Sequence, residues 1–374
     1  MADANRNAGV ARTFYLVALA VLIGVIAHVG RDVLIPFVIA VFLCFLIFTL
    51  KENIRRAPYV GKYLPNWLAY LLAFAAIGGA IMAFVEIIKT NVEILLEAWP
   101  AYEERLRGVV DASIAYLQGR GVIPGEVVGS VEELQGAALS VVRPLLTQAA
   151  GSLTGITSNF LTFITIFLYL VFMLIERGRI FSKIKRIGEN GRDGEVVNET
   201  ITDIGALVRQ YITIKTISNL ITATISFAIM KLIGVQFAGF WALLIFVFNY
   251  IPIFGAASAI TLPALLALVQ PEGGGVQMAL ITLASLIGAE QIMSNGIEPR
   301  LVGRTLNLSP LVVLFALSVW GSLWGFAGLL LSVPITVSVM LILTQFRSTR
   351  SIAILLSDDG EIAPLKHAPL GGAT

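Results

Sequence analysis

The chain has 374 residues, of which 57% are hydrophobic and 13% are charged, and its formal net charge at pH 7 is +2. A soluble domain carries about 25% charged residues, and a chain this apolar could not cover its surface with polar side chains, so the composition excludes a soluble globular fold and predicts a lipid environment. The small net charge argues against a nucleic-acid partner, and one cysteine with two histidines leaves no internal disulfide and no ordinary zinc site, so neither a cofactor nor a metal is expected.

Apolar runs along the chain predict membrane spans, because a helix that crosses a bilayer needs about 20 mainly apolar residues. The last run is too long for one crossing, and glycines near its middle, followed by Pro334, predict two segments that could form a hairpin. The fold class is therefore all-α: a polytopic integral membrane protein with about eight transmembrane helices and re-entrant or broken helical hairpins in the C-terminal half. In chain order, the predicted spans are 13–29, 33–50, 67–88, 156–175, a more polar one at 212–233, then 237–250, 253–269, 276–292 and the long run 311–346.

The basic residues predict the orientation, because Lys and Arg collect in cytoplasmic loops. With the N-terminus inside, the basic segments 51–65, 177–192 and 300–304 fall in the cytoplasm, and the mainly acidic segment 89–143 falls outside. The first apolar run lacks an A-x-A cleavage site, so we expect a retained span rather than a signal peptide. Both termini are expected in the cytoplasm.

The outer segment has apolar residues at three- and four-residue steps, as in an amphipathic helix that lies along the membrane surface or packs on a partner subunit. An ordinary extracytoplasmic helical cap explains the pattern equally well. The expected regions are 1–88 with transmembrane helices 1–3, 89–150 with the extracytoplasmic amphipathic segment, 151–210 with helix 4 and a basic cytoplasmic helical segment, 211–346 with a transport region of broken helices, and 347–374 as a cytoplasmic tail.

Catalytic signatures are absent from the sequence. It contains no H-E-x-x-H, no P-loop, no G-x-G-x-x-G and no G-x-S-x-G nucleophile elbow. We therefore expect a protein that is not an enzyme and not an ATP-driven pump of the usual kind. If it moves a solute, a gradient of another solute or ion is the expected energy source.

Polar residues at membrane depth are the candidate functional residues, because a charge at the centre of a spanning helix costs about 2.5–3.5 kcal/mol and usually faces protein or a wet cavity. Lys215, Asn219, Thr222 and Ser226 lie at i, i+4, i+7 and i+11, so they share one face of the fifth predicted span. The face could line a substrate path. Hydrogen bonding between helices, with the lysine extending to the cytoplasmic surface, is an equal alternative.

A second polar group ends the span at 276–292. On a continuing helix, Glu290, Gln291, Asn295 and Glu298 would share one side, and Arg300 follows Pro299, which predicts a helix break that frees backbone groups. Glu290 is the strongest single candidate for a titrating or cation-binding carboxylate. A solvated carboxylate at the cytoplasmic boundary is the alternative.

A third feature interrupts the apolar region between 237 and 269. Asn249, Pro252 and Gly255 stand within eight residues of one another, and non-helical backbone at membrane depth is tolerated only inside protein or beside a water-filled cavity. The motif predicts either a tight turn between two spans or the tip of a re-entrant helix that contributes to a substrate site.

These segments, in their order and spacing, resemble the autoinducer-2 exporter family of bacterial permeases, most specifically from about 205 to 340. The resemblance implies about eight spans in a bacterial inner (plasma) membrane, a homo-oligomer, and export of autoinducer-2 or sodium or lithium/proton antiport. Phe254 and Leu262 depart from the expected pattern and leave the compound open. The matching blocks are Gln210-Tyr211, Lys215-Thr216, Phe248 to Pro252, Leu266 to Gln270, Asn295 to Arg304, Leu308 to Val313, Trp320-Gly321, Trp324-Gly325 and Leu331 to Pro334.

The leading hypothesis is a secondary exporter of a small polar organic solute, driven by an ion gradient. A sodium or lithium/proton antiporter that uses Glu290 or Glu298 as its proton carrier is the first alternative. A non-transporting membrane scaffold, whose outer segment recruits partners, is the second. The expected partners are the lipid bilayer, a small-molecule or ion substrate and further copies of the chain.

Overall fold

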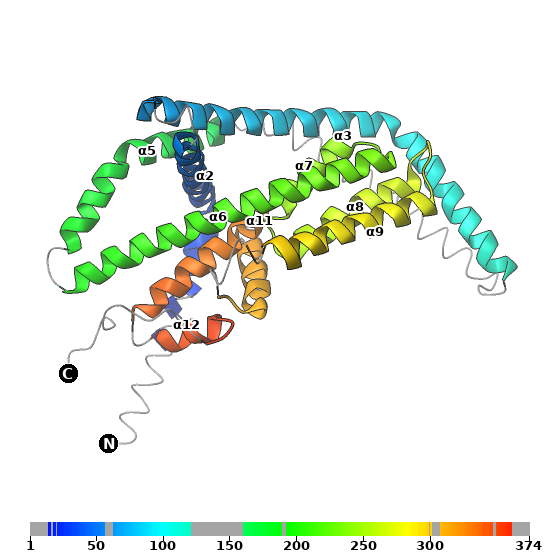
Figure 1. Cartoon of the computed structure of the whole chain (residues 1–374). Coiled ribbons are helices and arrows are strands. Elements are labelled where there is room, and N and C mark those ends of the chain that lie inside the picture. The colour runs from blue at the N-terminus through cyan, green and yellow to red at the C-terminus, as the bar shows by residue number, and fades with distance from the viewer. Residues whose placement is uncertain are drawn as a thin grey trace, which may run out of the picture. The chain divides into compact units, whose positions relative to one another are not determined.

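The computed structural model describes residues 14–15, 18–19, 21–56, 63–120, 160–188, 192–298, 300, 307–346 and 349–360. Within these ranges the elements are helices (Figure 1), which confirms the all-α prediction. They are α2 (Arg31–Arg56), α3 (Asn66–Gly119), α5 (Phe160–Gly188), α6 (Arg192–Ile233), α7 (Ala238–Phe248), α8 (Phe254–Val269), α9 (Val276–Gln291), the π-helical turn η1 (Ile292–Ile297), α11 (Pro310–Thr344) and α12 (Arg350–Leu356).

The helices confirm a polytopic membrane protein. Within the described ranges, five segments are long and apolar enough to cross a membrane, and three shorter apolar segments accompany them. Residues 21–29 are also helical, but the rest of the first predicted span and residues 121–159 lie partly or wholly outside the described residues. The long segments are Arg31–Arg56, Asn66–Tyr116, Ile201–Ile233, Val276–Ile297 and Pro310–Thr344, and the shorter ones are Leu161–Glu176, Ala238–Phe248 and Phe254–Val269.

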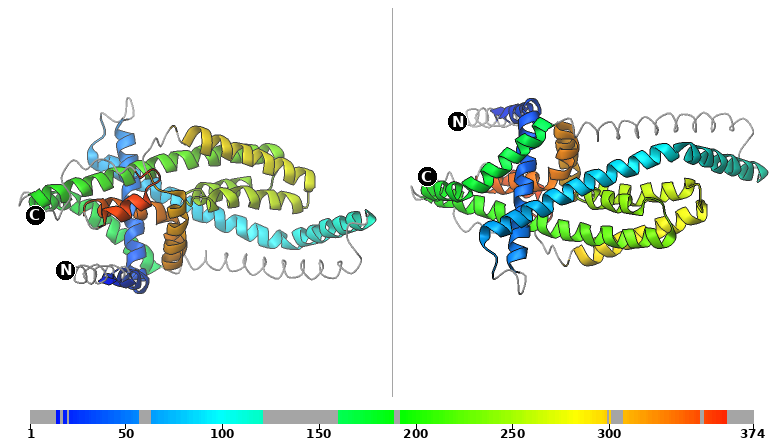
Figure 2. Two further views of the ribbon diagram at one scale, coloured as in Figure 1. Left: turned by 90° about the horizontal axis from the view of Figure 1, so that it is seen from below. Right: turned by 90° about the horizontal axis from the view of Figure 1, so that it is seen from above.

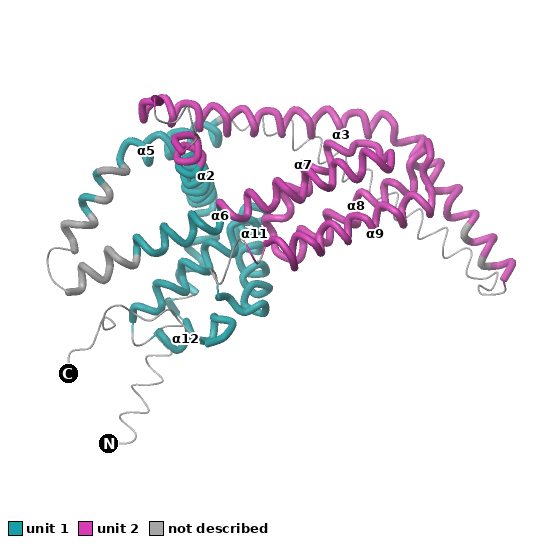
Figure 3. The backbone as a smooth tube through the Cα atoms, viewed as in Figure 1, with its two compact units in different colours: residues 1–49, 161–212, 304–374 teal, residues 50–160, 213–303 magenta. Residues whose placement is uncertain are grey.

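The chain divides into two compact units (Figure 3). Unit 1 comprises residues 1–49, 161–212 and 304–374, and unit 2 comprises residues 50–160 and 213–303. Because the boundaries fall inside α2 and α6, each of these helices contributes to both units.

A helical hairpin within α11 belongs to unit 1. The two halves meet at Gly325, whose φ of 59° and ψ of −135° are not helical. Trp320 Nε1 donates to Thr336 Oγ1 at 3.1 Å, whereas sixteen residues of straight helix would separate these residues by about 24 Å. The hairpin predicted from the length of this run is confirmed. The second half packs with α6 through a cluster that includes Val208, Ile212, Val333 and Val337.

Replacement of Gly325 with alanine tests this hairpin. Positive φ combined with strongly negative ψ is accessible to glycine but strained for a residue with a Cβ. We therefore expect the free energy of unfolding of the variant to be lower by about 1–3 kcal/mol. The thermal unfolding midpoint of the purified variant measures the effect. The matched control is Gly24→Ala, because a Cβ at Gly24 meets nothing within 4 Å; equal midpoints would show that the hairpin does not need this backbone conformation.

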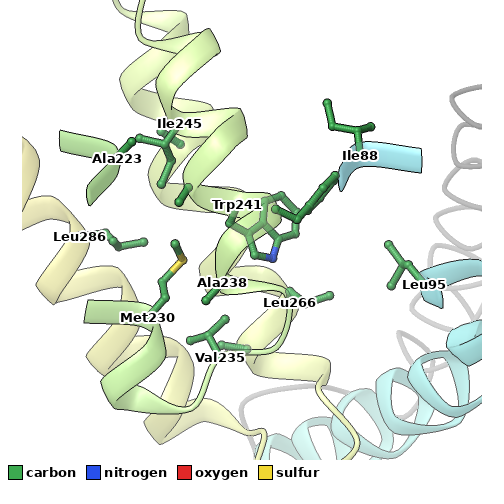
Figure 4. Packing of buried hydrophobic residues seen from close by; sticks show 14 of the residues in the cluster. Ile88, Leu95, Ala223, Met230, Val235, Ala238, Trp241, Ile245, Leu266 and Leu286 are labelled. Atoms are coloured by element: carbon green, nitrogen blue, oxygen red, sulfur yellow. The ribbon is translucent and has the colours of Figure 1, made fainter. Parts of the chain in front are cut away.

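Unit 2 is built on α3, α7, α8 and α9 with the second part of α6. Helices α7, α8 and α9 lie side by side in Figures 1 and 2. Figure 4 shows Trp241 of α7 at the centre of their apolar cluster, with Met230 of α6 and Leu286 of α9 on one side and Ile88 of α3 on another. This core fixes the positions of the polar residues described below.

Helix α3 runs without interruption from Asn66 to Gly119. The span expected at 67–88 and the amphipathic helix expected beyond it are therefore one helix, because no residue near position 89 breaks the hydrogen-bond ladder. Pro100 lies inside it, and Figure 1 shows that α3 bends in its C-terminal part. A proline explains such a bend because it removes one backbone hydrogen bond from the helix. The apolar side chains Val92, Leu95 and Tyr102 are buried in the cluster of unit 2.

Candidate functional site

The polar residues predicted to line a path all belong to unit 2, which covers residues 213–303 in its second segment. They come from α6, from the turn between α7 and α8 with the start of α8, and from α9, η1 and the residues just after it. In chain order they are Lys215, Asn219, Asn249, Pro252, Gly255, Glu290, Gln291, Asn295, Glu298 and Arg300.

The helices α7 and α8 form a short hairpin. With 11 and 16 residues, they extend about 16 Å and 24 Å, less than the roughly 30 Å thickness of a hydrocarbon core. Gln270 holds the two open ends together, since its amide donates to the carbonyl of Gly234 and accepts from the N–H of Gln236. The hairpin therefore enters and leaves at one end, and its tip lies at the other.

A cavity of about 450 Å³ lies at the open end of the hairpin, lined by Gln270, Glu272, the following glycines and Met278. Tyr102 of α3 hydrogen-bonds to Gln236 beside it, and Arg105 donates to the carbonyl of Gly274 at 3.1 Å. Two polar contacts from α3 thus hold the loops that border this cavity.

The tip of the hairpin is a tight turn made by the Asn-Tyr-Ile-Pro motif. Pro252 lacks a backbone N–H and disfavours helix in the residue before it, so α7 ends here. Ile253 has a φ of 64° and a ψ of −57°, and Phe254 N donates to Pro252 O at 2.6 Å, which is a γ-turn. Gly255 then begins to close the first turn of α8 by donating to Ile251 O at 2.9 Å.

Helix α6 supplies side chains that satisfy this broken backbone. The last carbonyls of a helix have no partner inside the helix, and Asn219 Nδ2 donates to one of them, Phe246 O, at 3.1 Å. The hydroxyls of Thr216 and Tyr250 lie 2.6 Å apart. Asn219, Thr222 and Ser226 are at most 3% exposed. The spacing placed these side chains on one face of α6, and that face is buried.

Replacement of Asn219 with alanine leaves the carbonyl of Phe246 without this donor in a buried position. An unsatisfied buried acceptor costs about 1–3 kcal/mol, and we expect the free energy of unfolding to fall by that amount. Thermal or denaturant unfolding of the purified protein measures it. Thr224→Ala on the same helix is the control, because Thr224 is exposed and its hydroxyl donates only to Leu220 O of its own helix; an equal effect of both substitutions would contradict this role.

Two of the charged candidate residues, Lys215 and Glu298, form a close pair. Lys215 Nζ lies 2.7 Å from Glu298 Oε1, and the two side chains are 16% and 24% exposed. Ser218 Oγ donates to the other carboxylate oxygen at 3.4 Å. Lys215 therefore binds a carboxylate rather than extending alone to the membrane surface.

Glu290 is held by neutral donors. Asn249 Nδ2 donates to Glu290 Oε2 at 3.4 Å, and Ser294 Oγ donates to Oε1 at 2.9 Å. The carboxylate is half-buried, on the last turn of α9. It therefore connects α9 to the tip of the hairpin.

The α-helix does not continue unchanged after Gln291, because residues 292–297 form the π-helical turn η1. Such turns widen the helix and are frequent at functional sites. Gln291 and Asn295 hydrogen-bond to each other and are exposed, as is Arg300. Glu290 and Glu298 contact candidate residues on the hairpin tip and on α6, whereas Gln291 and Asn295 contact each other. Pro299 lies outside the described residues.

Thr216, Ser218 and Tyr250 were missed as contact residues by the sequence reasoning. Ser218 follows Lys215 by three positions, so helical spacing alone could have placed it beside the pair. The contact between Thr216 and Tyr250 joins residues 34 positions apart, and no local pattern signals it.

The comparison with known protein families decides the identity. The model of the AI-2E family transporter matches residues 15–348. The chain belongs to the AI-2E transporter family. The resemblance seen in the sequence is thereby confirmed, and with it the assignment to a family of membrane-spanning transporters.

Individual members of the AI-2E family are similar over most of their length. The AI-2 transport protein TqsA of Escherichia coli K12 is 30% identical over 334 residues, which cover 88% of this chain and 90% of the relative. A Haemophilus influenzae protein, named as a transport protein by inference, is 28% identical, and the match covers 95% of this chain and 98% of the relative. A Borreliella burgdorferi protein named in the same way is 26% identical, and the match covers 98% of this chain and 97% of the relative. The AI-2E match thus includes both units.

Proposed function

We propose that this AI-2E transporter is a secondary exporter of a small polar organic solute of the autoinducer-2 class, driven by an ion gradient. The observation that carries the proposal is the re-entrant hairpin, whose tip places the polar residues Asn249 and Tyr250 against α6 and α9. Broken helices of this kind form the substrate and ion sites of many secondary transporters. The name of TqsA, an AI-2 transport protein, supports the solute class.

We propose that the substrate path runs along the polar face of α6 toward the pair of Lys215 and Glu298, within the expected transport region 211–346. The burial of this face and the ion pair support the proposal. We further propose that both termini lie in the cytoplasm of a bacterial cell and that the chain forms a homo-oligomer in the inner membrane. The basic loops support this orientation.

Flux into reconstituted vesicles tests the proposed export. Purified full-length protein in proteoliposomes should accumulate labelled autoinducer-2, a furanone, against its concentration gradient. The accumulation should be saturable and should occur only while a sodium, lithium or proton gradient is imposed. Protein-free vesicles are the blank. Absence of saturable flux for the furanone and for a panel of related polyols and sugars would overturn the proposal, and saturable flux that ignores every ion gradient would overturn the coupling.

A second candidate function, sodium or lithium/proton antiport, is favoured by the half-buried carboxylate of Glu290 beside the hairpin tip. Under this function, a sodium or lithium gradient should drive proton movement in the absence of any organic solute. A pH-sensitive dye inside the same vesicles measures that movement. Unchanged proton flux in Glu290→Gln would contradict the role of this carboxylate.

A further inference from the structure

The corner between α2 and α3 carries basic side chains at the place where two apolar segments end. Lys51 directly follows the predicted span 33–50, and Trp67 begins the predicted span 67–88. Both spans lie in helices that are long and apolar enough to cross a membrane, so the side chains at this corner are expected at the level of the lipid headgroups. Residues 50–56 and all of α3 belong to unit 2, and the corner therefore lies within one compact unit.

Two contacts join α2 to α3 at this corner. Arg55 Nη1 donates to Asn66 Oδ1 at 2.6 Å, and Lys51 Nζ lies 5.1 Å from the centre of the Tyr70 ring, within the range of a cation–π contact. Lys51 and Arg55 are four residues apart on α2, as Asn66 and Tyr70 are on α3, so each pair shares one face of its helix. The contacts hold both basic side chains along the line where the two helices meet.

The corner has more positive than negative charge. Its described charged residues are Lys51, Glu52, Arg55 and Arg56. Glu52 lies 3.6 Å from Lys51 and 3.5 Å from Arg56, so this one carboxylate is shared by two cations. Arg55 is exposed, and no carboxylate among the described residues pairs with it.

The guanidinium of Arg55 suits an anion with the geometry of a phosphate. It has five N–H donors in a planar fork that matches two phosphate oxygens. Its hydrogen bond to Asn66 uses one of these donors and brings no negative charge. Asn66 thus orients the fork without neutralising it.

Exposed aromatic rings beside Arg55 indicate that the anion belongs to a lipid. Tyr63 is 84% exposed and Trp67, which follows the partner of Arg55, is 67% exposed. Such rings have an apolar body and a polar tip, and they are enriched at the level of the headgroups. A soluble anion would leave both rings in water, whereas a phospholipid would cover them with its glycerol and upper acyl chains.

We propose that the corner between α2 and α3 binds one anionic phospholipid, with the phosphate on Arg55 and the glycerol region on Trp67 and Tyr63. Lys51, whose side chain is only 13% exposed, adds positive charge behind Arg55. Basic groups beside spanning helices attract anionic lipids in this way. The lipid stabilises the contact between the two helices, and this inference does not depend on the proposed solute or its coupling ion.

Lipid titration of the purified full-length protein in a neutral detergent tests the site. Phosphatidylglycerol should raise the melting temperature saturably, whereas phosphatidylcholine with the same acyl chains should raise it much less, because its choline neutralises the phosphate. Native mass spectrometry should detect retained phosphatidylglycerol on each chain. Sodium chloride at about 1 M, which screens charges beyond about 3 Å, should weaken the binding.

Substitutions at the corner locate the bound lipid. Arg55→Gln and Trp67→Leu should each weaken phosphatidylglycerol binding by about tenfold and remove one retained lipid per chain. Arg55→Lys should restore part of the binding, because it keeps the charge and loses the fork. The matched control is Arg107→Gln: Arg107 pairs with the glutamate four residues before it, as Arg56 does, and its loss should leave lipid binding unchanged.

A gain of affinity guards against variants that fail to fold. Glu52→Gln removes the carboxylate of the corner, so it should bind phosphatidylglycerol more tightly than the unaltered protein. The inference is overturned if both lipids raise the melting temperature equally, or if Arg55→Gln and Trp67→Leu retain as much phosphatidylglycerol as the control. An equal rise with inorganic phosphate alone also overturns it, because the site would then bind a soluble anion and not a lipid.

Discussion

Gly255→Ala is expected to unfold the tip of the hairpin and abolish transport. A Cβ at this position would overlap the carbonyl oxygen of Phe248 and lie 2.8 Å from Asn249 Cα. The obstructing atoms are backbone, so no side-chain rotation relieves the overlap, and α7 and α8 would have to separate. We expect the free energy of unfolding to fall by about 3 kcal/mol or more, measured as thermal unfolding of the purified variant together with vesicle flux.

The matched control for this substitution is Gly288→Ala in α9. A Cβ at Gly288 meets nothing within 4 Å, and alanine is favoured over glycine inside a helix by roughly 0.5–1 kcal/mol. The control should therefore unfold at the same temperature as the unaltered protein or above it. Normal stability and flux in Gly255→Ala would show that the close approach of α7 and α8 is not required.

Neutralising either member of the pair between Lys215 and Glu298 is expected to reduce transport more than tenfold, equivalent to about 1.4 kcal/mol. Each single change leaves the remaining charge in a mostly buried position without its partner, which costs more than the pair contributes. Because both side chains keep some contact with solvent, we expect a loss of about 1–3 kcal/mol of stability, below the value for a fully buried pair. Flux and unfolding of Glu298→Gln and Lys215→Met measure both effects.

The coupling between the two residues separates a specific pair from two independent charges. The double variant Lys215→Met with Glu298→Gln should be more stable than the sum of the two single losses predicts. The exposed pair of Arg107 and Glu103 on α3 is the control, with an expected coupling of about 0.3–0.5 kcal/mol. Additive effects at Lys215 and Glu298 would contradict a functional pair.

Hydropathy and helix breakers were enough to predict the fold class, because lipid exposure and backbone hydrogen bonding act locally along the chain. The hairpin in α11 followed from the length of its apolar run and the glycines near its middle. The break between α7 and α8 followed from Pro252 in the same way. The continuity of α3 did not, because a change from apolar to amphipathic composition does not interrupt a helix.

The partners of the candidate residues depended on packing and could not be derived from spacing. The spacing placed Asn219 on a polar face, but its contact with the carbonyl of Phe246 requires the packing of α6 on α7. Glu290 was singled out from its position at the end of an apolar run, whereas its contact with Asn249 joins residues 41 positions apart. The π-helical turn after Gln291 contains Gly296 and is followed by Pro299, but these residues predicted a helix break near Pro299 rather than a π-helical turn.

The γ-turn at Ile253 makes the hairpin tip a store of conformational energy. A β-branched residue at positive φ is a true outlier, and such a conformation costs about 1–3 kcal/mol. An energy of this size changes the ratio between two conformations by a factor of roughly 5 to 150. It therefore favours any other conformation of the tip in which Ile253 has a negative φ. The conformation of the turn is therefore not stable by itself. Contacts from α6 and α9, through Asn219 and Glu290, stabilise it.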